Sequence, residues 1–159
     1  MPLVRKQSIT RRQQTPKPPV LTGFEHIHRY WDPGRQLWAA KILPGEYYVT
    51  THDEIIVTVL GSCISACIHD PRTATGGMNH FMLPIEGVNG LGPWHASDTN
   101  SATRYGNVAM ERLINDLLRN GSRRQDLVVK VFGGAQISEG MSDVGRRNIA
   151  FVNDYINTE

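Results

Sequence analysis

The chain has 159 residues and a mass of 17.8 kDa, with 40% hydrophobic, 8% aromatic and 20% charged residues. This length fits one domain with its own core, and it is too short for two ordinary domains. The composition excludes fibrous, coiled-coil and fully disordered chains. No apolar run approaches the roughly 20 residues of a transmembrane helix, and no apolar stretch follows the basic N-terminal residues as in a secretory signal. We therefore expect a cytoplasmic globular protein.

The formal net charge of +2 is unevenly distributed. Residues 1–20 contain five of the 17 basic residues and no acidic one, which leaves 12 basic against 15 acidic residues in the remainder, a net charge of −3. We predict that residues 1–20 form a basic flexible leader and residues 21–159 a single domain. A basic arm can bind nucleic acid, but five charges spread over twenty residues without an aromatic side chain are more typical of a solvated leader. Nucleic acid is therefore not an expected partner.

The first elements predicted along the chain are short strands. An aromatic-rich segment from Phe24 to Trp38 precedes them and is expected to pack on the domain. Runs of alternating or β-branched residues, bounded by Gly, Pro and Asp, then follow and are typical of strands. The predicted strands are residues 46–51, 55–60, 64–68 and 78–83.

Helical periodicity begins in the second half of the chain. Apolar residues recur at three- and four-residue steps from Ser101 to Asn120, which predicts an amphipathic helix with Gly121 as its C′ residue. The apolar run 127–132 predicts a short buried strand. A second helix is predicted to begin near Ser142 or Asp143, either of which could cap it. Its apolar side is expected to hold Ile149, Val152 and Ile156.

Two cysteines, Cys63 and Cys67, are too few for a secreted disulfide framework and indicate a reduced compartment. Cys63 follows a β-branched run and a Leu-Gly-Ser turn, an arrangement that exposes a nucleophilic sulfur beside backbone N–H groups able to bind an oxyanion. Gly61 would permit the sharp turn. Cys67 lies inside a predicted strand, where we expect a small buried core residue.

A thiol with an ordinary pKa of about 8.5 is mostly protonated at neutral pH, so a nucleophilic cysteine needs a base or a positive field. His80 is the candidate base, because it lies in the middle of a predicted apolar strand, and two glycines precede that strand. The alternative is an inert buried cysteine and a core histidine. Residue types alone leave both possibilities open.

Metal binding and nucleotide binding are less well supported. Cys63, Cys67, His69 and His80 match none of the closed zinc patterns, and no second Cys pair completes a structural site. His26 and His28 are another candidate pair. The Gly-Gly pairs of the sequence form neither a Walker A loop nor a dinucleotide fingerprint. We expect no metal site and no nucleotide site.

Several stretches occurring in order resemble the chemoreceptor glutamine deamidase family, CheD, over roughly residues 44–154. Each stretch would be weak by itself, but their joint occurrence is specific. The stretches are TVLGSC at 58–63, IHDP at 68–71, GMNHFMLP at 77–84, RYGN at 104–107, VFGGA at 131–135 and GRRN at 145–148.

The resemblance implies an enzyme that hydrolyses the side-chain amide of glutamines on methyl-accepting chemotaxis receptors, yielding glutamate and ammonia without a cofactor. By motif, Cys63 would be the nucleophile, His80 the base and Thr58 the residue that orients the imidazole. Backbone N–H groups near the nucleophile would bind the oxyanion. The implied oxyanion or substrate-binding residues are Ser62, Gly61 and Asn79.

The fold implied by the resemblance is α+β, with a layered, β-sandwich-like core of short strands and helices packed outside, similar to deamidating toxin domains. Implied partners are the cytoplasmic part of the receptors, with recruitment to receptor arrays but no membrane insertion, and the chemotaxis phosphatase CheC. Typical members continue beyond the second helix, so residues 21–159 are expected to lack the family's C-terminal strands. Gln136-Ile137 also stands where the resemblance leads us to expect a more apolar or aromatic pair. The alternative function is a non-catalytic protein that binds receptor or phosphatase and retains the cleft.

Overall fold

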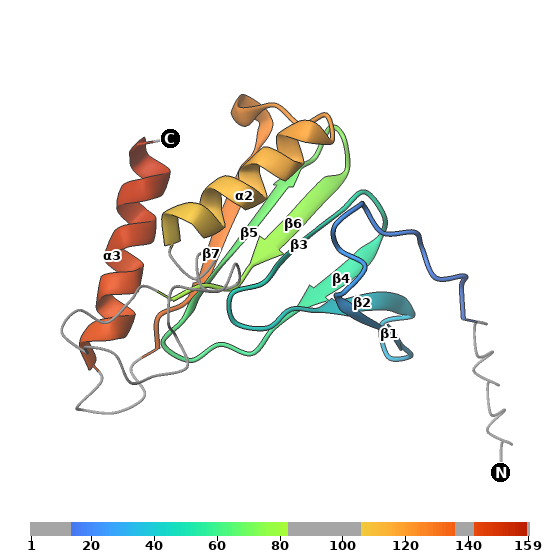
Figure 1. Cartoon of the computed structure of the whole chain (residues 1–159), viewed down its shortest axis with the longest axis horizontal. Coiled ribbons are helices and arrows are strands. Elements are labelled where there is room, and N and C mark those ends of the chain that lie inside the picture. Colours follow the sequence, from blue (N-terminus) through green and yellow to red (C-terminus); the bar gives the residue numbers. More distant parts are fainter. Residues whose placement is uncertain (1–13, 83–105, 136–141, 159) are drawn as a thin grey trace, which may run out of the picture.

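The structure, a computed structural model, describes residues 14–82, 106–135 and 142–158 and has an α+β architecture, as predicted (Figure 1). Its strands form a three-stranded sheet in the order β1-β2-β4 and a four-stranded sheet in the order β3-β6-β5-β7. Only β2 and β4 pair in parallel; the other pairs in the described sheets are antiparallel. The elements are β1 (His28–Asp32), β2 (Leu37–Lys41), β3 (Tyr47–Thr50), β4 (Glu54–Val57), β5 (Ile64–Asp70), β6 (Thr75–Asn79), α2 (Gly106–Arg119), a 3-10 helix (Arg124–Asp126), β7 (Val128–Gly133) and α3 (Ser142–Thr158).

The two faces of the four-stranded sheet have different neighbours. Successive residues of a strand point to opposite faces. Gly77 faces α2, since a Cβ there would lie 2.6 Å from Leu113. Its neighbour Met78, together with the paired residues Cys67 and Tyr48, belongs to the other face. We call this second face the inter-sheet face, because the Tyr48 hydroxyl donates from it to a carboxylate of β4.

The helix α2 covers the opposite face through the predicted apolar stripe. Ala109, Leu113 and Leu117 recur every four residues and have no exposed surface. Gly121 ends the helix with a φ of +94°, a conformation that glycine adopts without strain. The amide of Ser122 then donates to the carbonyl of Leu117 at 3.1 Å. Residues 101–105 of the predicted helix lie outside the described residues.

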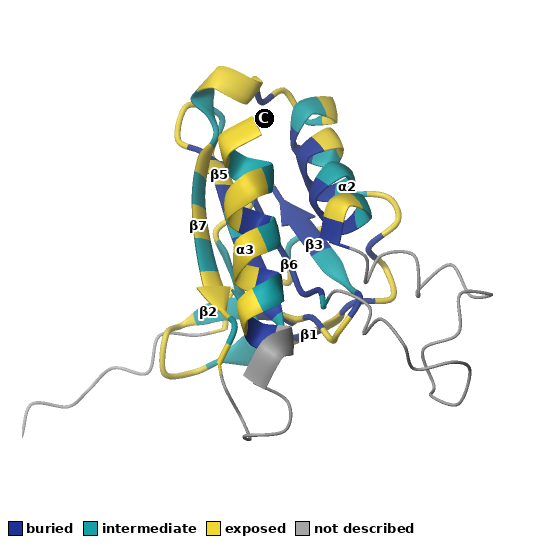
Figure 2. Ribbon diagram, turned by 90° about the vertical axis from the view of Figure 1, so that its left-hand side faces the viewer, coloured by how far each residue is buried: buried dark blue, intermediate teal, exposed yellow. Residues whose placement is uncertain are grey.

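The last helix, α3, lies beside α2, and one side of it is buried (Figure 2). Val152 is 1% exposed, as predicted. Phe151 meets Phe81 edge-on, with ring centroids 6.0 Å apart. Ile149 differs from the prediction in remaining 39% exposed, because it lies over the backbone of Gly134 rather than in the core. No helix among the described residues is long and apolar enough to cross a membrane.

The strand β7 was predicted correctly in position but not in burial. It is an edge strand of the described sheet, and Val128 and Phe132 are 41% and 53% exposed. The register pairs Phe132 with Ser65, which lies two residues before Cys67 on β5 and therefore points to the same face. The exposed side chains of β7 thus lie on the inter-sheet face. The apolar run is therefore exposed on one side, which periodicity within the strand could not indicate.

The aromatic segment before β3 contains two strands, β1 and β2, that the sequence pattern did not predict. Residues of the predicted leader contact them. The indole Nε1 of Trp38 donates to the carbonyl of Thr15 at 3.0 Å, and the ammonium of Lys17 lies 5.5 Å from the Trp38 ring centroid. Residues 14–20 are thus attached to the three-stranded sheet, while residues 1–13 lie outside the described residues.

A buried ion pair links strands within this sheet. The Nε of Arg29 lies 2.9 Å from a carboxylate oxygen of Glu54, and their side chains are 3% and 0% exposed. The second carboxylate oxygen accepts from the hydroxyls of Tyr48 and Thr50 at 3.0 and 2.7 Å, and Arg29 donates to the carbonyl of Pro18 at 2.6 Å. One carboxylate therefore joins both sheets.

Replacing one partner of this pair should destabilise the fold strongly. We expect Arg29→Met to lower the free energy of unfolding by about 3 kcal/mol or more, because it leaves the Glu54 charge buried without its cation. Urea denaturation measures the change. Arg35→Met is the control, since its ion pair with Asp32 is solvent-exposed and should leave the midpoint nearly unchanged. Equal destabilisation by the two variants would contradict this account.

Candidate active site

The two sheets meet at the imidazole of His80, which directly follows β6 and is 2% exposed. Thr58, which directly follows β4, lies against it with Oγ1 2.7 Å from Nδ1. The same hydroxyl lies 2.9 Å from the carbonyl of Ile42, after β2. Residues that follow two strands of the three-stranded sheet thus hold the ring of His80, which follows a strand of the four-stranded sheet.

These contacts define the tautomer of His80. The carbonyl of Ile42 can only accept, so the single hydroxyl proton of Thr58 is donated to it. The Thr58 oxygen must then accept from Nδ1–H of His80, which leaves Nε2 as the basic nitrogen. Among the described residues Nε2 is buried and has no hydrogen-bond partner. This orientation is the one that a general base acting through Nε2 would need.

Cys63 comes to the same face as His80 through the pairing of β5 with the chain after β6. Ile64 and Phe81 exchange both backbone hydrogen bonds at 2.9 Å. Cys63 and His80 each precede a member of this pair by one residue, so the antiparallel register makes them diagonal neighbours on the inter-sheet face. Such neighbours lie about 7–8 Å apart, within reach of their side chains and a bound substrate group. Two of the residues predicted as catalytic are thus adjacent in the register.

Burial sets the resting protonation of this pair. It raises the pKa of the Cys63 thiol, an effect that the residue's own backbone N–H partly offsets. Burial also lowers the pKa of His80, since the charged imidazolium would be poorly solvated. At neutral pH the pair is accordingly a thiol and a neutral imidazole.

The predicted turn residues Gly61 and Ser62 lie next to Cys63, and Ser62 is 7% exposed. Their carbonyl oxygens accept hydrogen bonds from Ala135 N at 2.9 Å and from Asn148 Nδ2 at 2.8 Å, respectively. The role of Asn148 was not predicted, although GRRN was among the stretches that carried the resemblance. The usable signal was the spacing of Gly145 and Asn148, which places both on one face of a helix.

Asn79 is not brought to the face that holds His80. It has no exposed surface, its Oδ1 accepts from the amide of Ala66 at 2.8 Å, and its Nδ2 donates to the carbonyl of Ala109 at 3.2 Å. The amide thus ties β5 and β6 to α2. Adjacent residues of an extended chain point to opposite faces, so the side chain of Asn79 points away from the face on which His80 lies.

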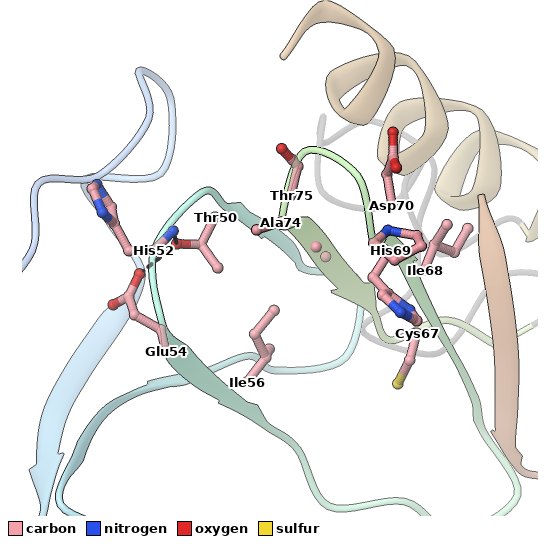
Figure 3. A pocket seen from close by; sticks show the side chains of 13 residues that line it. Thr50, His52, Glu54, Ile56, Cys67, Ile68, His69, Asp70, Ala74 and Thr75 are labelled. Carbon is pink, nitrogen blue, oxygen red and sulfur yellow. Dashed lines mark hydrogen bonds between the residues drawn. The ribbon is translucent and has the colours of Figure 1, made fainter. Parts of the chain in front are cut away.

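A cavity of about 400 Å³ lies between the sheets further along the inter-sheet face (Figure 3). Cys67 and His69 of β5 line one side, and Glu54 and Ile56 of β4 line the other. Cys63 and His80 are not among its lining residues. Burial also raises the pKa of Cys67.

Comparison with known proteins identifies relatives of the chain. Residues 82–159 match the family model described as "CheD chemotactic sensory transduction". A protein of Halorhodospira halophila named "Probable chemoreceptor glutamine deamidase CheD" is 56% identical over 142 residues, which are 89% of this chain and 65% of the relative.

Two further relatives carry the same name. The protein of Hahella chejuensis is 48% identical over 149 residues, covering 92% of this chain and 69% of that protein. The protein of Hydrogenovibrio crunogenus is 54% identical over 128 residues, covering 80% and 65%. The chain thus spans about two thirds of the length of these curated relatives.

Proposed function

The chain belongs to the CheD family, and from this premise we propose that it is a cysteine-dependent hydrolase. It converts specific glutamine side chains of methyl-accepting chemotaxis receptors to glutamate and releases ammonia. The name that its relatives carry supports the substrate class. The observation that carries the proposal is the orientation of His80 by Thr58 on the face that Cys63 shares, with Nε2 buried and without a hydrogen-bond partner among the described residues.

The reaction begins with attack of the Cys63 sulfur on the glutamine Cδ. A sulfur–carbon bond forms, the thiol proton passes to Nε2 of His80, and the carbonyl oxygen becomes an oxyanion. Backbone N–H groups of Ser62 and Cys63 bind this oxyanion. When the carbon–nitrogen bond breaks, His80 gives its proton to the leaving nitrogen and ammonia departs.

The resulting thioester is hydrolysed by water. Nε2 of His80 takes a proton from the water as its oxygen attacks the acyl carbon. The carbon–sulfur bond then breaks, Cys63 regains a proton and glutamate is released. Thr58 holds the ring through both half-reactions, and no step of this sequence uses a metal or an organic cofactor.

The partners and location follow from the proposed substrate and from family resemblance. The substrate is the cytoplasmic part of the receptor, so the protein acts in the cytoplasm and is recruited to receptor arrays. The chemotaxis phosphatase CheC is a second proposed partner. The family resemblance is the support for both statements.

Mass spectrometry of a receptor's cytoplasmic fragment tests the proposed function. After incubation with the protein, particular peptides should gain the mass that distinguishes glutamate from glutamine, with release of an equal amount of ammonia. The Cys63→Ala protein is the control and should leave every peptide unchanged. Receptor binding without any conversion would overturn the proposal in favour of a non-catalytic binding protein.

The hydroxyl of Thr58 should matter for rate rather than for substrate binding. Thr58→Val preserves the shape but removes the acceptor for Nδ1–H, so we expect kcat to fall about tenfold to a hundredfold with little change in KM. Thr58→Ser retains the hydroxyl and should recover most of the rate. Steady-state ammonia release measures both constants. Equal losses in the two variants would contradict a role for the hydroxyl.

A further inference from the structure

The turn that carries the proposed nucleophile is held at three consecutive carbonyl groups. Two of the donors come from the backbone just after β7, and the third is a side chain of α3. Each contact is short enough for a well-formed hydrogen bond. The contacts are Ala135 N to Gly61 O at 2.9 Å, Asn148 Nδ2 to Ser62 O at 2.8 Å and Gly134 N to Cys63 O at 2.9 Å.

The contact of Asn148 determines the direction of an N–H group. The carbonyl of Ser62 and the N–H of Cys63 belong to one planar trans peptide unit, in which they point in opposite directions. When the carbonyl is held toward α3, the N–H of Cys63 points away from it, and that N–H lies close to the residue's own sulfur. In the part of the chain that the structure describes, neither Ser62 N–H nor Cys63 N–H donates to a backbone carbonyl.

Asn148 reaches the turn because Gly134, after β7, and Gly145, in α3, let the helix approach closely. A Cβ on Gly145 would lie 2.6 Å from the carbonyl oxygen of Gly134 and 3.1 Å from that of Ala135. Gly145 and Asn148 are three residues apart on one face of the helix. Asn148 has no exposed surface, so its contact with Ser62 is made without competition from solvent.

We propose that Asn148 is a positioning residue that aims the Cys63 N–H at the developing oxyanion. The inference rests on the proposed function, because it assigns the oxyanion site of the same reaction. Asn148 itself does not touch the substrate. It acts through the Ser62–Cys63 peptide plane, and the glycines of the VFGGA and GRRN stretches act by letting the helix come close enough.

Two reactions of Cys63 separate this role from a general structural one. Iodoacetamide alkylates the thiol by displacement of iodide and forms no oxyanion, so its rate reports the thiol and His80 alone. Propanal, which reproduces the Cβ, Cγ and Cδ of a glutamine, adds the thiol across its carbonyl to give a hemithioacetal. The sulfur–carbon bond forms and the thiol proton ends on the carbonyl oxygen, which lies in the proposed oxyanion site. Protection of Cys63 from alkylation measures the affinity for propanal.

In Asn148→Ala we expect the affinity for propanal to fall about tenfold, with an alkylation rate within about twofold of the wild-type rate and the same pH dependence. With receptor fragment as substrate, kcat should fall about tenfold to a hundredfold at a nearly constant KM. Should the wild-type protein release no ammonia, the proposed function fails, while the propanal and alkylation measurements still test Asn148.

A second variant and a control accompany the test. Gly145→Ala moves α3 away from the turn and should repeat the Asn148→Ala result even if the latter variant folds poorly. Val152→Ala removes buried volume from the same helix and should lower the melting temperature without changing either Cys63 reaction. Unchanged propanal affinity in both test variants, or an alkylation rate that falls in parallel with it, overturns the proposal.

Discussion

Replacing Cys63 by alanine should reduce deamidation at least about a thousandfold, whereas Cys67→Ala should change kcat/KM less than about twofold. Both thiols are half-buried, and burial raises the pKa of each. The direction of the pKa shift is thus the same for both thiols, and we base the prediction on their positions. Cys63 precedes β5 and is diagonal to His80, while Cys67 lies within β5 opposite Met78. Initial rates of ammonia release at saturating receptor fragment measure the effect.

The two cysteines provide a matched pair, because four residues of extended chain separate their Cα atoms by about 13 Å. This separation is too long for a disulfide and for both sulfurs to reach one substrate carbon. Circular dichroism of each variant shows whether the fold is retained. Retained activity in Cys63→Ala together with lost activity in Cys67→Ala would move the nucleophile to the inter-sheet cavity that Cys67 lines.

Local periodicity predicted those elements whose burial is one-sided and whose ends carry a turn residue. The helix α2 is the best example, since its apolar stripe and Gly121 both act within a few residues. The strands β1 and β2 were missed because their stability depends on distant partners. Arg29 is charged and would be read as a surface residue, yet it is buried against Glu54, which lies 25 positions later in the chain.

The candidate site shows the same division between local and long-range information. A thiol at a turn and a histidine in an apolar run made Cys63 and His80 candidates, but residue types alone left open an inert cysteine and a core histidine. The pairing of Thr58 with His80 came only from family resemblance, because a threonine after a strand has no distinctive local pattern. The contact between Asn148 and Ser62 spans 86 positions and depends on a helix reaching a turn, which one sequence does not reveal.

His80→Ala should lower kcat about a hundredfold to ten-thousandfold, the usual contribution of a general base, and should also change the pH profile. The base works only while neutral, so kcat/KM of the wild-type protein should fall as pH drops through the pKa of His80. Because burial lowers that pKa from 6.5, the loss should occur below pH 6.5. This acid limb should be absent from the residual activity of His80→Ala. An unchanged acid limb in the variant would assign the titration to another group.

The same lowered pKa makes a linked prediction about stability. The unfolded chain binds a proton at an ordinary histidine more readily than the folded protein does at His80. The free energy of unfolding should therefore fall as pH decreases from 6.5 to the lower folded-state pKa, and level off below it. His80→Gln should remove this part of the pH dependence. His69→Gln should preserve it, because His69 is exposed, although it lies on the same inter-sheet face. Urea denaturation at several pH values distinguishes these results, and equal slopes in the wild-type and His80→Gln proteins would show that the buried imidazole is not held neutral.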